Sequence, residues 1–269
     1  MLVRRDSRSG ANDLITAFRP CKVDEIYGQT TNKNLLKNYL DKASLPHTLL
    51  FTGPAGCGKT TAARIVALGL NCESVEKSTS EPCLECVSCK SILNHNSLDV
   101  IEINVGKSGG KDATDRAVGD LSSSPFNSRN KVLIFDEAHE LTNAAKDLLL
   151  KVMEDGYNHV YLIFCTNQPE KLRSKKKDGG EAFLGRCTAM NFNKLSTEAL
   201  VDILKNVSEF EGINYDLEIL NFIAEEARGT PRDALNYLQK IDSEGSWSFD
   251  IAKEIMISDL LEDDPQIIE

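Results

Sequence analysis

The stretch TLLFTGPAGCGKTT, residues 48–61, joins a short apolar run to a glycine-rich turn that ends in Lys-Thr-Thr. Its second part fits the pattern G-x-x-x-x-G-K-[ST], which holds phosphate groups when a strand precedes it and a helix follows. Glycines let backbone N–H groups converge on phosphate oxygens, and a helix N-terminus adds favourable partial charge. We therefore expect a strand at 48–52, a nucleotide-phosphate site, and a helix that begins near Thr60.

The predicted nucleotide-binding residues are consecutive: Gly53, Pro54, Ala55, Gly56, Cys57, Gly58, Lys59, Thr60 and Thr61. Lys59 would reach the β- and γ-phosphates of ATP, and Thr60 would be a ligand of Mg²⁺. The alternative is a chance glycine-rich turn, which the strand and helix signals on either side disfavour. The stretch therefore predicts ATP and Mg²⁺ as the bound groups.

A second apolar run, KVLIF at 131–135, is followed by two acids. Ligands bind beyond the carboxyl ends of the strands in open α/β sheets. Asp136 would hold Mg²⁺ directly or through water, and Glu137 would orient or deprotonate the attacking water. The alternative, an acidic helix cap after a core strand, is weaker because a phosphate loop lies upstream. Residues 136–139 also spell the Asp-Glu-Ala-His box of one helicase class, but that class's other motifs, S-A-T and Q-x-x-G-R-x-x-R, are absent from the sequence.

A polar residue, Asn167, follows the next apolar run at 160–164. If the two runs form neighbouring strands, the Asn167 side chain can contact the γ-phosphate or the attacking water. A turn-forming Asn before Gln168-Pro169 is nearly as good an interpretation. Asn167 is therefore a catalytic candidate together with Lys59 and the two acids.

Five apolar runs separated in several places by helical patterns indicate a parallel sheet with flanking helices, an α/β fold. The runs lie at 48–52, 99–103, 131–135, 160–164 and 189–192. Four amphipathic helices are expected after the last run, at roughly 197–210, 216–228, 231–241 and 248–260. The sequence thus predicts an α/β domain over 1–194, an all-helical domain over 195–262 and a short tail over 263–269.

Composition excludes some classes of protein. The chain has 269 residues and a net charge of -10, which argues against non-specific binding to nucleic acid. No apolar run approaches the roughly 18 residues of a membrane span, and the N-terminal residues lack the apolar stretch of a secretion signal. We therefore expect a cytoplasmic protein in a reducing compartment, where clustered cysteines bind metal more often than they form disulfides. The biased segment RSKKKDGG, 173–180, is expected to be a loop.

Four of the eight cysteines, Cys72, Cys83, Cys86 and Cys89, lie within one short segment. Four thiolates are the natural ligand set for tetrahedral Zn²⁺, and a site with no vacant position is structural. An iron–sulfur cluster or redox thiols are the alternatives, although nothing in the sequence implies electron transfer. Pro82 and the short polar residues indicate a tight knuckle rather than a helix. The remaining cysteines are expected to be packed thiols.

Several motifs together resemble one family. Phe18-Arg19-Pro20, Gly69-Leu70-Asn71-Cys72, Gly185-Arg186-Cys187 and Gly229-Thr230-Pro231-Arg232-Asp233-Ala234-Leu235 accompany the phosphate loop and the three-cysteine knuckle. With them the chain resembles the ATPase subunit, gamma/tau, of bacterial DNA polymerase III clamp loaders, within the AAA+ superfamily. The resemblance covers roughly residues 15–262, and the knuckle inside an ATPase is its most specific element.

The resemblance implies an AAA+ P-loop ATPase core, a zinc module at 72–89 inserted between the first helix and the second strand, and a helical lid. Arg186 would be an arginine finger that reaches the γ-phosphate bound by a neighbouring subunit. Arg232 would contact the phosphates bound by its own subunit and couple the lid to the nucleotide state. Gly185 stands where the family has serine, which weakens the assignment of Arg186.

The resemblance also implies partners: other clamp-loader subunits in a pentameric assembly, a sliding clamp and primer–template DNA, with no membrane. It implies that the chain, which ends at Glu269, lacks the collar domain of such subunits. Lys107, Lys111, Arg116 and the loop 171–177 are candidates for DNA phosphate contacts, although a solvated basic loop is the plainer interpretation of the last.

Two other functions remain open from the sequence. One is another DNA-remodelling AAA+ motor, against which the four cysteines argue. The other is a structural subunit that does not hydrolyse ATP, against which the intact Lys59, Thr60, Asp136 and Glu137 argue.

Overall fold

The computed structural model describes residues 13–263 except 108–109, 120, 122 and 173–178. The chain divides into two compact units, which we describe separately. The sheet unit contains residues 20–54 and 58–193, and the helical unit contains the described parts of 1–19, 55–57 and 194–269. The segment before Pro20 thus groups with the C-terminal helices, whereas the sequence analysis placed all of 1–194 in one domain.

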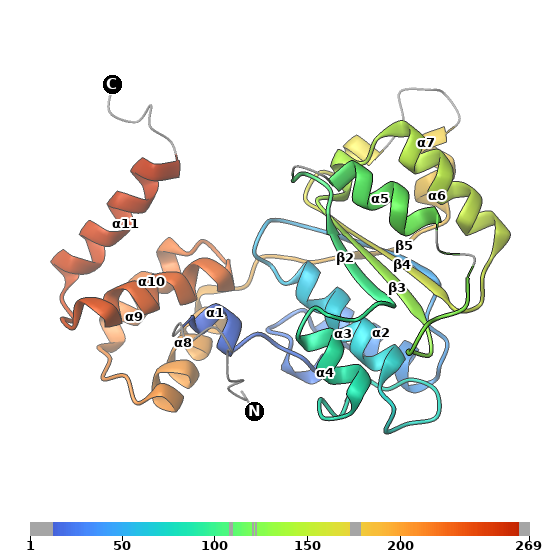
Figure 1. Cartoon of the computed structure of the whole chain (residues 1–269). Helices are drawn as coiled ribbons and strands as arrows, with labels where there is room; N and C mark the ends of the chain where they lie inside the picture. The colour runs from blue at the N-terminus through green and yellow to red at the C-terminus, as the bar shows by residue number, and fades with distance from the viewer. Residues whose placement is uncertain (1–12, 108–109, 120, 122, 173–178, 264–269) are drawn as a thin grey trace. The chain divides into compact units, whose positions relative to one another are not determined.

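The sheet unit is built on five parallel strands in the order β2-β3-β4-β1-β5 (Figure 1). The strands are β1 (Thr48–Thr52), β2 (Val100–Asn104), β3 (Lys131–Asp136), β4 (Val160–Thr166) and β5 (Thr188–Asn191). Each lies within two residues of a predicted run. The predicted five-stranded parallel sheet is therefore confirmed.

Helices cover both faces of this sheet. In Figure 1, α2, α3 and α4 lie on one side and α5, α6 and α7 on the other. The α-helices are α2 (Thr30–Asp41), α3 (Lys59–Asn71), α4 (Val87–Leu93), α5 (Gly110–Gly119), α6 (Asn143–Asp155) and α7 (Gly179–Gly185). Three short 3-10 helices accompany them: η1 (Val23–Glu25), η2 (Ala138–Glu140) and η3 (Pro169–Leu172). Gly179 and Gly180 begin α7, so this end of the predicted loop at 173–180 is wrong, and its remaining residues lie outside those described.

The sheet core explains why its strands read as continuous apolar runs. Leu133, Phe135, Leu162 and Phe164 belong to a buried cluster with residues of α5, α6 and α7. The alternate residues of β3 and β4 are buried as well, beneath α3. The Phe135 and Phe164 rings stack with centroids 5.1 Å apart. Each such buried side chain contributes about 1.5–3 kcal/mol, which holds the carboxyl ends of the strands in fixed positions.

The helical unit contains the predicted C-terminal helices and a short N-terminal one. They are α1 (Leu14–Ala17), α8 (Thr197–Glu211), α9 (Leu217–Glu226), α10 (Pro231–Glu244) and α11 (Phe249–Asp263). Ser196 and Asp216 cap α8 and α9 through their side chains, and Gly212 and Gly245 end α8 and α10 in the left-handed conformation. The N–H of Leu14 donates to Gln239 Oε1 at 2.9 Å, which ties α1 to α10.

No helix in the described part of the chain is long and apolar enough to cross a bilayer.

Candidate nucleotide and metal sites

The sheet order brings three predicted site segments to one edge. β4 lies between β1 and β3, with Thr52 level with Thr166 and Phe135 level with Phe164. The phosphate loop leaves β1, Asp136 ends β3 with Glu137 directly after it, and Asn167 follows β4. All three segments therefore emerge at the carboxyl ends of adjacent strands. Ligands bind at this edge in open α/β sheets.

The loop backbone has the conformations that a phosphate cradle requires. Gly53 has a φ of 134°, and a Cβ added there would lie 2.0 Å from the Phe192 carbonyl oxygen at the end of β5. Gly58 has a φ of 95°, caps α3, and would direct an added Cβ into space with no described heavy atom within 4 Å. Gly56 is left-handed too, with a φ of 73°. Only glycine adopts these conformations readily and leaves room for a ligand beside the backbone.

Lys59 is the first residue of α3 and is only 8% exposed. Its Nζ donates to the carbonyl oxygens of Gly53 at 2.8 Å and Pro54 at 2.6 Å. Thr60 and Thr61 follow in the first helical turn, whose backbone N–H groups lack intrahelical partners. The residues present therefore fit a nucleotide phosphate, with Lys59 and the helix N-terminus supplying positive charge.

The two acids lie where β3 passes into η2. Asp136 is half-buried, and Glu137 has a left-handed φ of 53° and a side chain 41% exposed. His139 Nδ1 lies 3.3 Å from Glu137 Oε2 and 3.1 Å from Thr166 Oγ1, while its Nε2 lies 3.3 Å from Glu140 Oε1. The imidazole is thus surrounded by oxygen atoms and only 7% exposed. Sequence analysis missed His139 as a site residue, although its place two residues after Glu137 was the available signal.

Asn167 is exposed at the same sheet edge, directly after Thr166. The neighbouring Cys165 is fully buried, and burial together with the charge of Asp136 raises the pKa of its thiol well above the ordinary value. This cysteine is therefore a neutral packed thiol, in keeping with the sequence prediction.

The four cysteines Cys72, Cys83, Cys86 and Cys89 converge in the sheet unit. Their sulfur atoms all lie within 4.8 Å of one another. A Zn–S bond of about 2.3 Å puts tetrahedral sulfurs about 3.8 Å apart, so this cluster surrounds one ion with small adjustments. Two buried donors without partners in the described chain, Asn71 Nδ2 and Ser88 Oγ, belong to residues directly before cysteines of the cluster. The donor set therefore fits a structural zinc ion.

Local hydrogen bonds order the thiols. The N–H groups of Cys83, Cys86 and Cys89 donate to Cys72, Cys83 and Cys86 sulfur respectively, at 3.3–3.4 Å. Backbone N–H groups, first that of Glu85, lower the pKa of Cys83 to about 6, whereas burial raises the pKa of Cys89. A ligand thiol that is readily ionised and one that is shielded from water are both compatible with a closed metal site.

The predicted knuckle is wrong in one respect, because α4 begins immediately after Cys86. Cys86 accepts the N–H of Cys89 and so acts as the N-cap. Ile92, further along α4, packs with Leu68 of α3 in a cluster that includes Cys72 and Cys89. Pro82 lies five residues before the start of α4 and does not oppose it, and burial of the Ile92 face stabilises this short helix.

The two predicted arginines have different surroundings. Arg186 is exposed after α7, and its Nη2 lies 2.7 Å from Glu154 Oε1 of the same chain, while Nη1 donates to the Ala182 carbonyl at 2.9 Å. Contact with a neighbour's phosphate requires Arg186 to leave this pair. Arg232 is exposed in the first turn of α10 in the helical unit. The roles of both residues stay predictions.

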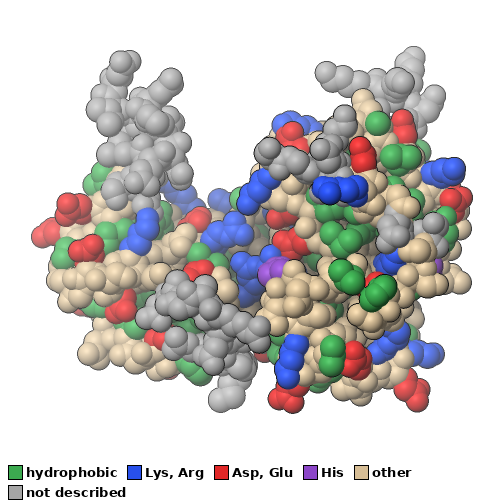
Figure 2. Space-filling view, viewed as in Figure 1, with side chains coloured by type: hydrophobic (Ala, Val, Ile, Leu, Met, Phe, Trp, Pro, Cys, Tyr) green, Lys and Arg blue, Asp and Glu red, His purple; other side chains and the backbone are tan. Residues whose placement is uncertain are grey.

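Only some of the candidate DNA contacts lie among the described side chains. Lys107 and Arg116 are exposed, while the side chain of Lys111 and most of the loop 171–177 lie outside the described residues. On the described face of the sheet unit in Figure 2, basic and acidic side chains are interspersed. DNA binding therefore stays a prediction.

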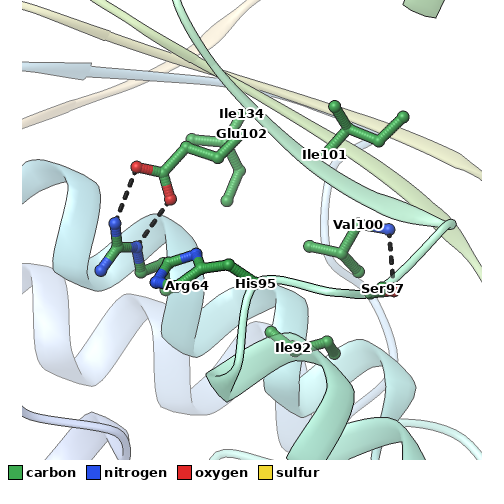
Figure 3. A pocket seen from close by; sticks show the side chains of 8 residues that line it. All are labelled: Arg64, Ile92, His95, Ser97, Val100, Ile101, Glu102 and Ile134. Carbon is green, nitrogen blue, oxygen red and sulfur yellow. Dashed lines mark hydrogen bonds and ion pairs between the residues drawn. The ribbon is translucent and has the colours of Figure 1, made fainter. Parts of the chain in front are cut away.

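A separate pocket of about 180 Å³ lies between α3, the end of α4 and β2. Its wall includes a bidentate pair in which Arg64 Nε and Nη2 donate to Glu102 at 2.7 and 2.8 Å, near His95 and Ser97 (Figure 3). The pair joins the helix of the phosphate loop to the edge strand. Sequence reasoning missed it because the two residues are 38 positions apart.

The sequence model of the family described as "DNA polymerase III, delta subunit" matches residues 28–196, more than half of the chain. The chain belongs to this DNA polymerase III subunit family. Members of the wider group that it resembles include Bacillus subtilis DNA polymerase III subunit tau, 34% identical over 89% of this chain and 40% of that protein. Buchnera aphidicola DNA polymerase III subunit gamma is 33% identical over 84% of this chain and 60% of that protein.

This polymerase III subunit homologue thus spans about two fifths of the length of the tau and gamma/tau relatives first matched. Among solved structures, its fold resembles Thermotoga maritima RuvB, with a TM-score of 0.61 and 20% identity over 89% of this chain and 72% of that one. A related RuvB structure is titled a Holliday junction branch migration motor. At this identity the likeness shows a shared fold and nothing about activity.

Proposed function

We propose that the protein is an ATPase subunit of a sliding-clamp loader, which uses ATP to load a ring clamp onto primer–template DNA. The observation that carries the proposal is that β4 separates β1 from β3, so that the phosphate loop, the two acids and Asn167 share one sheet edge. The names of the gamma/tau relatives support the choice of a clamp loader among P-loop ATPases. The four-cysteine cluster supports it over a generic DNA motor.

Each residue has a defined task in this proposal. Residues 53–61 bind the ATP phosphates, with Lys59 exchanging its loop carbonyls for phosphate oxygens. Thr60 and Asp136 hold Mg²⁺, which neutralises phosphate charge when bound. Glu137 accepts a proton from the attacking water, and Asn167 orients that water or the γ-phosphate. The loop lysine is already positioned by two carbonyls, so little ordering is needed when phosphate arrives.

Arg186 and Arg232 act between parts of an assembly in this proposal. Arg186 releases Glu154 and stabilises charge on the γ-phosphate of a neighbouring subunit, as its planar guanidinium suits. Arg232, at the start of α10, reports the nucleotide of its own subunit to the helical unit, which acts as a lid. The four cysteines hold a structural zinc ion that stabilises the segment between α3 and β2. The partners are other clamp-loader subunits, the clamp and DNA.

The proposal is tested by ATP turnover of the chain with candidate partner subunits, clamp and primed DNA. Glu137→Gln should keep ATP affinity within about threefold and slow turnover by about 10²–10⁴-fold, since it removes the general base. Lys59→Ala should abolish nucleotide binding. Glu170→Gln, which makes the same chemical change on an exposed residue of η3, should leave both unchanged. Turnover of Glu137→Gln at the parental rate would refute the assignment, and stimulation of the parent by DNA without a clamp would favour a generic motor.

A further inference from the structure

A single arginine reaches into the segment that carries the first cysteine. Arg129 lies in the loop before β3, and its guanidinium donates to three carbonyl oxygens of the segment 72–77. The acceptors are the carbonyls of Cys72, Val75 and Lys77, with Val75 at 2.8 Å. The donor and its acceptors are 52–57 positions apart in the chain, so the contact exists only in the folded protein.

The backbone around Arg129 is itself anchored. The N–H of Ser128 donates to the buried Asp99 carboxylate at 2.7 Å. The N–H of Asn130 donates to Asn71 Oδ1 at 2.8 Å, and its Nδ2 donates to the Leu70 carbonyl at 3.0 Å at the end of α3. The loop residues on both sides of Arg129 are therefore held by hydrogen bonds, and its side chain extends from this loop toward the cysteine segment.

Three convergent carbonyl oxygens need a donor with several N–H groups in one plane. Arginine carries five such donors in a rigid fork, whereas lysine offers a flexible point charge. Without the guanidinium, the carbonyl oxygens of Cys72, Val75 and Lys77 would lose these hydrogen bonds, and we expect the segment to be held less firmly. The Cys72 carbonyl is one of the three, so the contact fixes the backbone of a ligand residue.

Charge adds a second effect. Four thiolates around a divalent ion have a net charge of about −2. The same segment carries exposed Glu73 and Glu76 and the exposed Lys77, so its side chains add a net charge of about −1 beside the cluster. The permanent positive charge of Arg129 offsets part of this at the Cys72 end.

We propose that Arg129 is a positioning residue of the four-cysteine metal site, which fixes the Cys72 segment and offsets its charge. The proposal rests on the proposed zinc site. Arg129 lies two residues before β3, the strand that ends at Asp136. Partners of this kind outside the ligand shell alter metal affinity by about 10–100-fold.

The test measures Zn²⁺ affinity of the full chain by competition with a chromophoric chelator, and Co²⁺ binding by its tetrahedral thiolate spectrum. Arg129→Met, which keeps the length of the stem, should bind Zn²⁺ about 10–100-fold more weakly than the parent. Arg129→Lys should be intermediate because it keeps the charge and loses the fork. Lys90→Met, one residue from Cys89, removes a charge without touching the three carbonyls and should stay within about threefold.

The outcomes separate the two proposals. If the parent binds no metal, the zinc site fails, and the role of Arg129 fails with it. If the parent binds metal and Arg129→Met binds within about threefold of it, the role of Arg129 alone is refuted. A merely structural contribution of Arg129 would lower the melting temperature equally with and without metal, and that result overturns the proposal as well. ATP binding by each variant reports that the sheet unit is folded, and Arg129→Lys decides the matter if Arg129→Met does not fold.

Discussion

Replacement of Gly69 by alanine should destabilise the protein, although helix propensity alone predicts the reverse. Gly69 lies near the end of α3, where alanine would ordinarily add about 0.5–1 kcal/mol of stability. A Cβ added there would lie 2.3 Å from the Thr79 carbonyl oxygen and 3.3 Å from both terminal methyl carbons of Leu40. The Gly69 carbonyl also accepts the N–H of Thr79 at 3.1 Å. Glycine at this position lets the segment between Cys72 and Cys83 cross closely over the helix.

The magnitude follows from these contacts. An oxygen at 2.3 Å must move by roughly 1 Å to reach ordinary contact, and it is a backbone atom that cannot rotate away. Overpacking of this kind costs about 1–3 kcal/mol, which exceeds the gain in helix propensity. We expect a net loss of about 1–2 kcal/mol, which raises the population of the opened sheet unit about 5–30-fold.

The assay is native-state hydrogen exchange of the amides of β3 and β4, which report the sheet unit without the helical unit. Gly69→Ala should speed their exchange by the same factor and loosen metal retention. Gly119→Ala, at the end of α5, is the matched control because its added Cβ meets no described heavy atom within 4 Å. The control should exchange at the parental rate or slightly more slowly. Gly69→Ala with parental or slower exchange would refute the reasoning.

Two further perturbations test the loop anchor and the acidic pair. Asp99→Asn should lower stability by about 1–3 kcal/mol at pH 7, because a carboxylate that accepts the N–H groups of Phe126, Asn127 and Ser128 is replaced by a group that is itself a donor. Burial alone would raise the pKa of Asp99, but these N–H groups lower it below 3.8. The stabilisation is therefore complete above that value and is lost as the pH falls through the folded-state pKa. Urea titrations should show that the difference in unfolding free energy between parent and variant closes in acid, and a difference independent of pH would contradict this expectation. His139→Ala should slow turnover roughly tenfold with ATP affinity retained, since Glu137 loses its partner at 3.3 Å. Equal rate constants for parent and variant in single-turnover experiments would show that His139 has no role in the site.

Local sequence patterns predicted the elements that are stabilised by residues close together in the chain. The apolar runs became strands because residues on both faces of β3 and β4 are buried. The phosphate loop was readable because its glycines must adopt left-handed angles next to a helix start. Helix α4 was misread, since its first turn is capped by a cysteine thiol and its apolar face is covered by α3. Propensity scales contain neither effect.

The candidate site also has residues that the sequence identified and contacts that it did not. Asp136 and Glu137 were identified because a strand followed by acids is a local pattern. The position of His139 two residues after Glu137 was visible in the sequence, but its contact with Thr166 was not, because that contact joins η2 to the end of β4, 27 positions away. Arg186 looked available for a neighbour's phosphate, whereas the structure pairs it with Glu154 of α6. Charged side chains pair with whichever opposite charge lies close in the folded chain. Residue type and spacing in the sequence do not specify that distance.

The sequence by itself determined the alternation of strands and helices, the phosphate loop and the four sulfur ligands, because each depends on residues close together in the chain. Only the tertiary structure decided which strands are neighbours, which carbonyls Arg129 holds and which glycine lets the cysteine segment pass over α3. The physical reason is that these contacts join residues far apart in the chain, and they form only when burial of the sheet core has fixed the backbone on both sides.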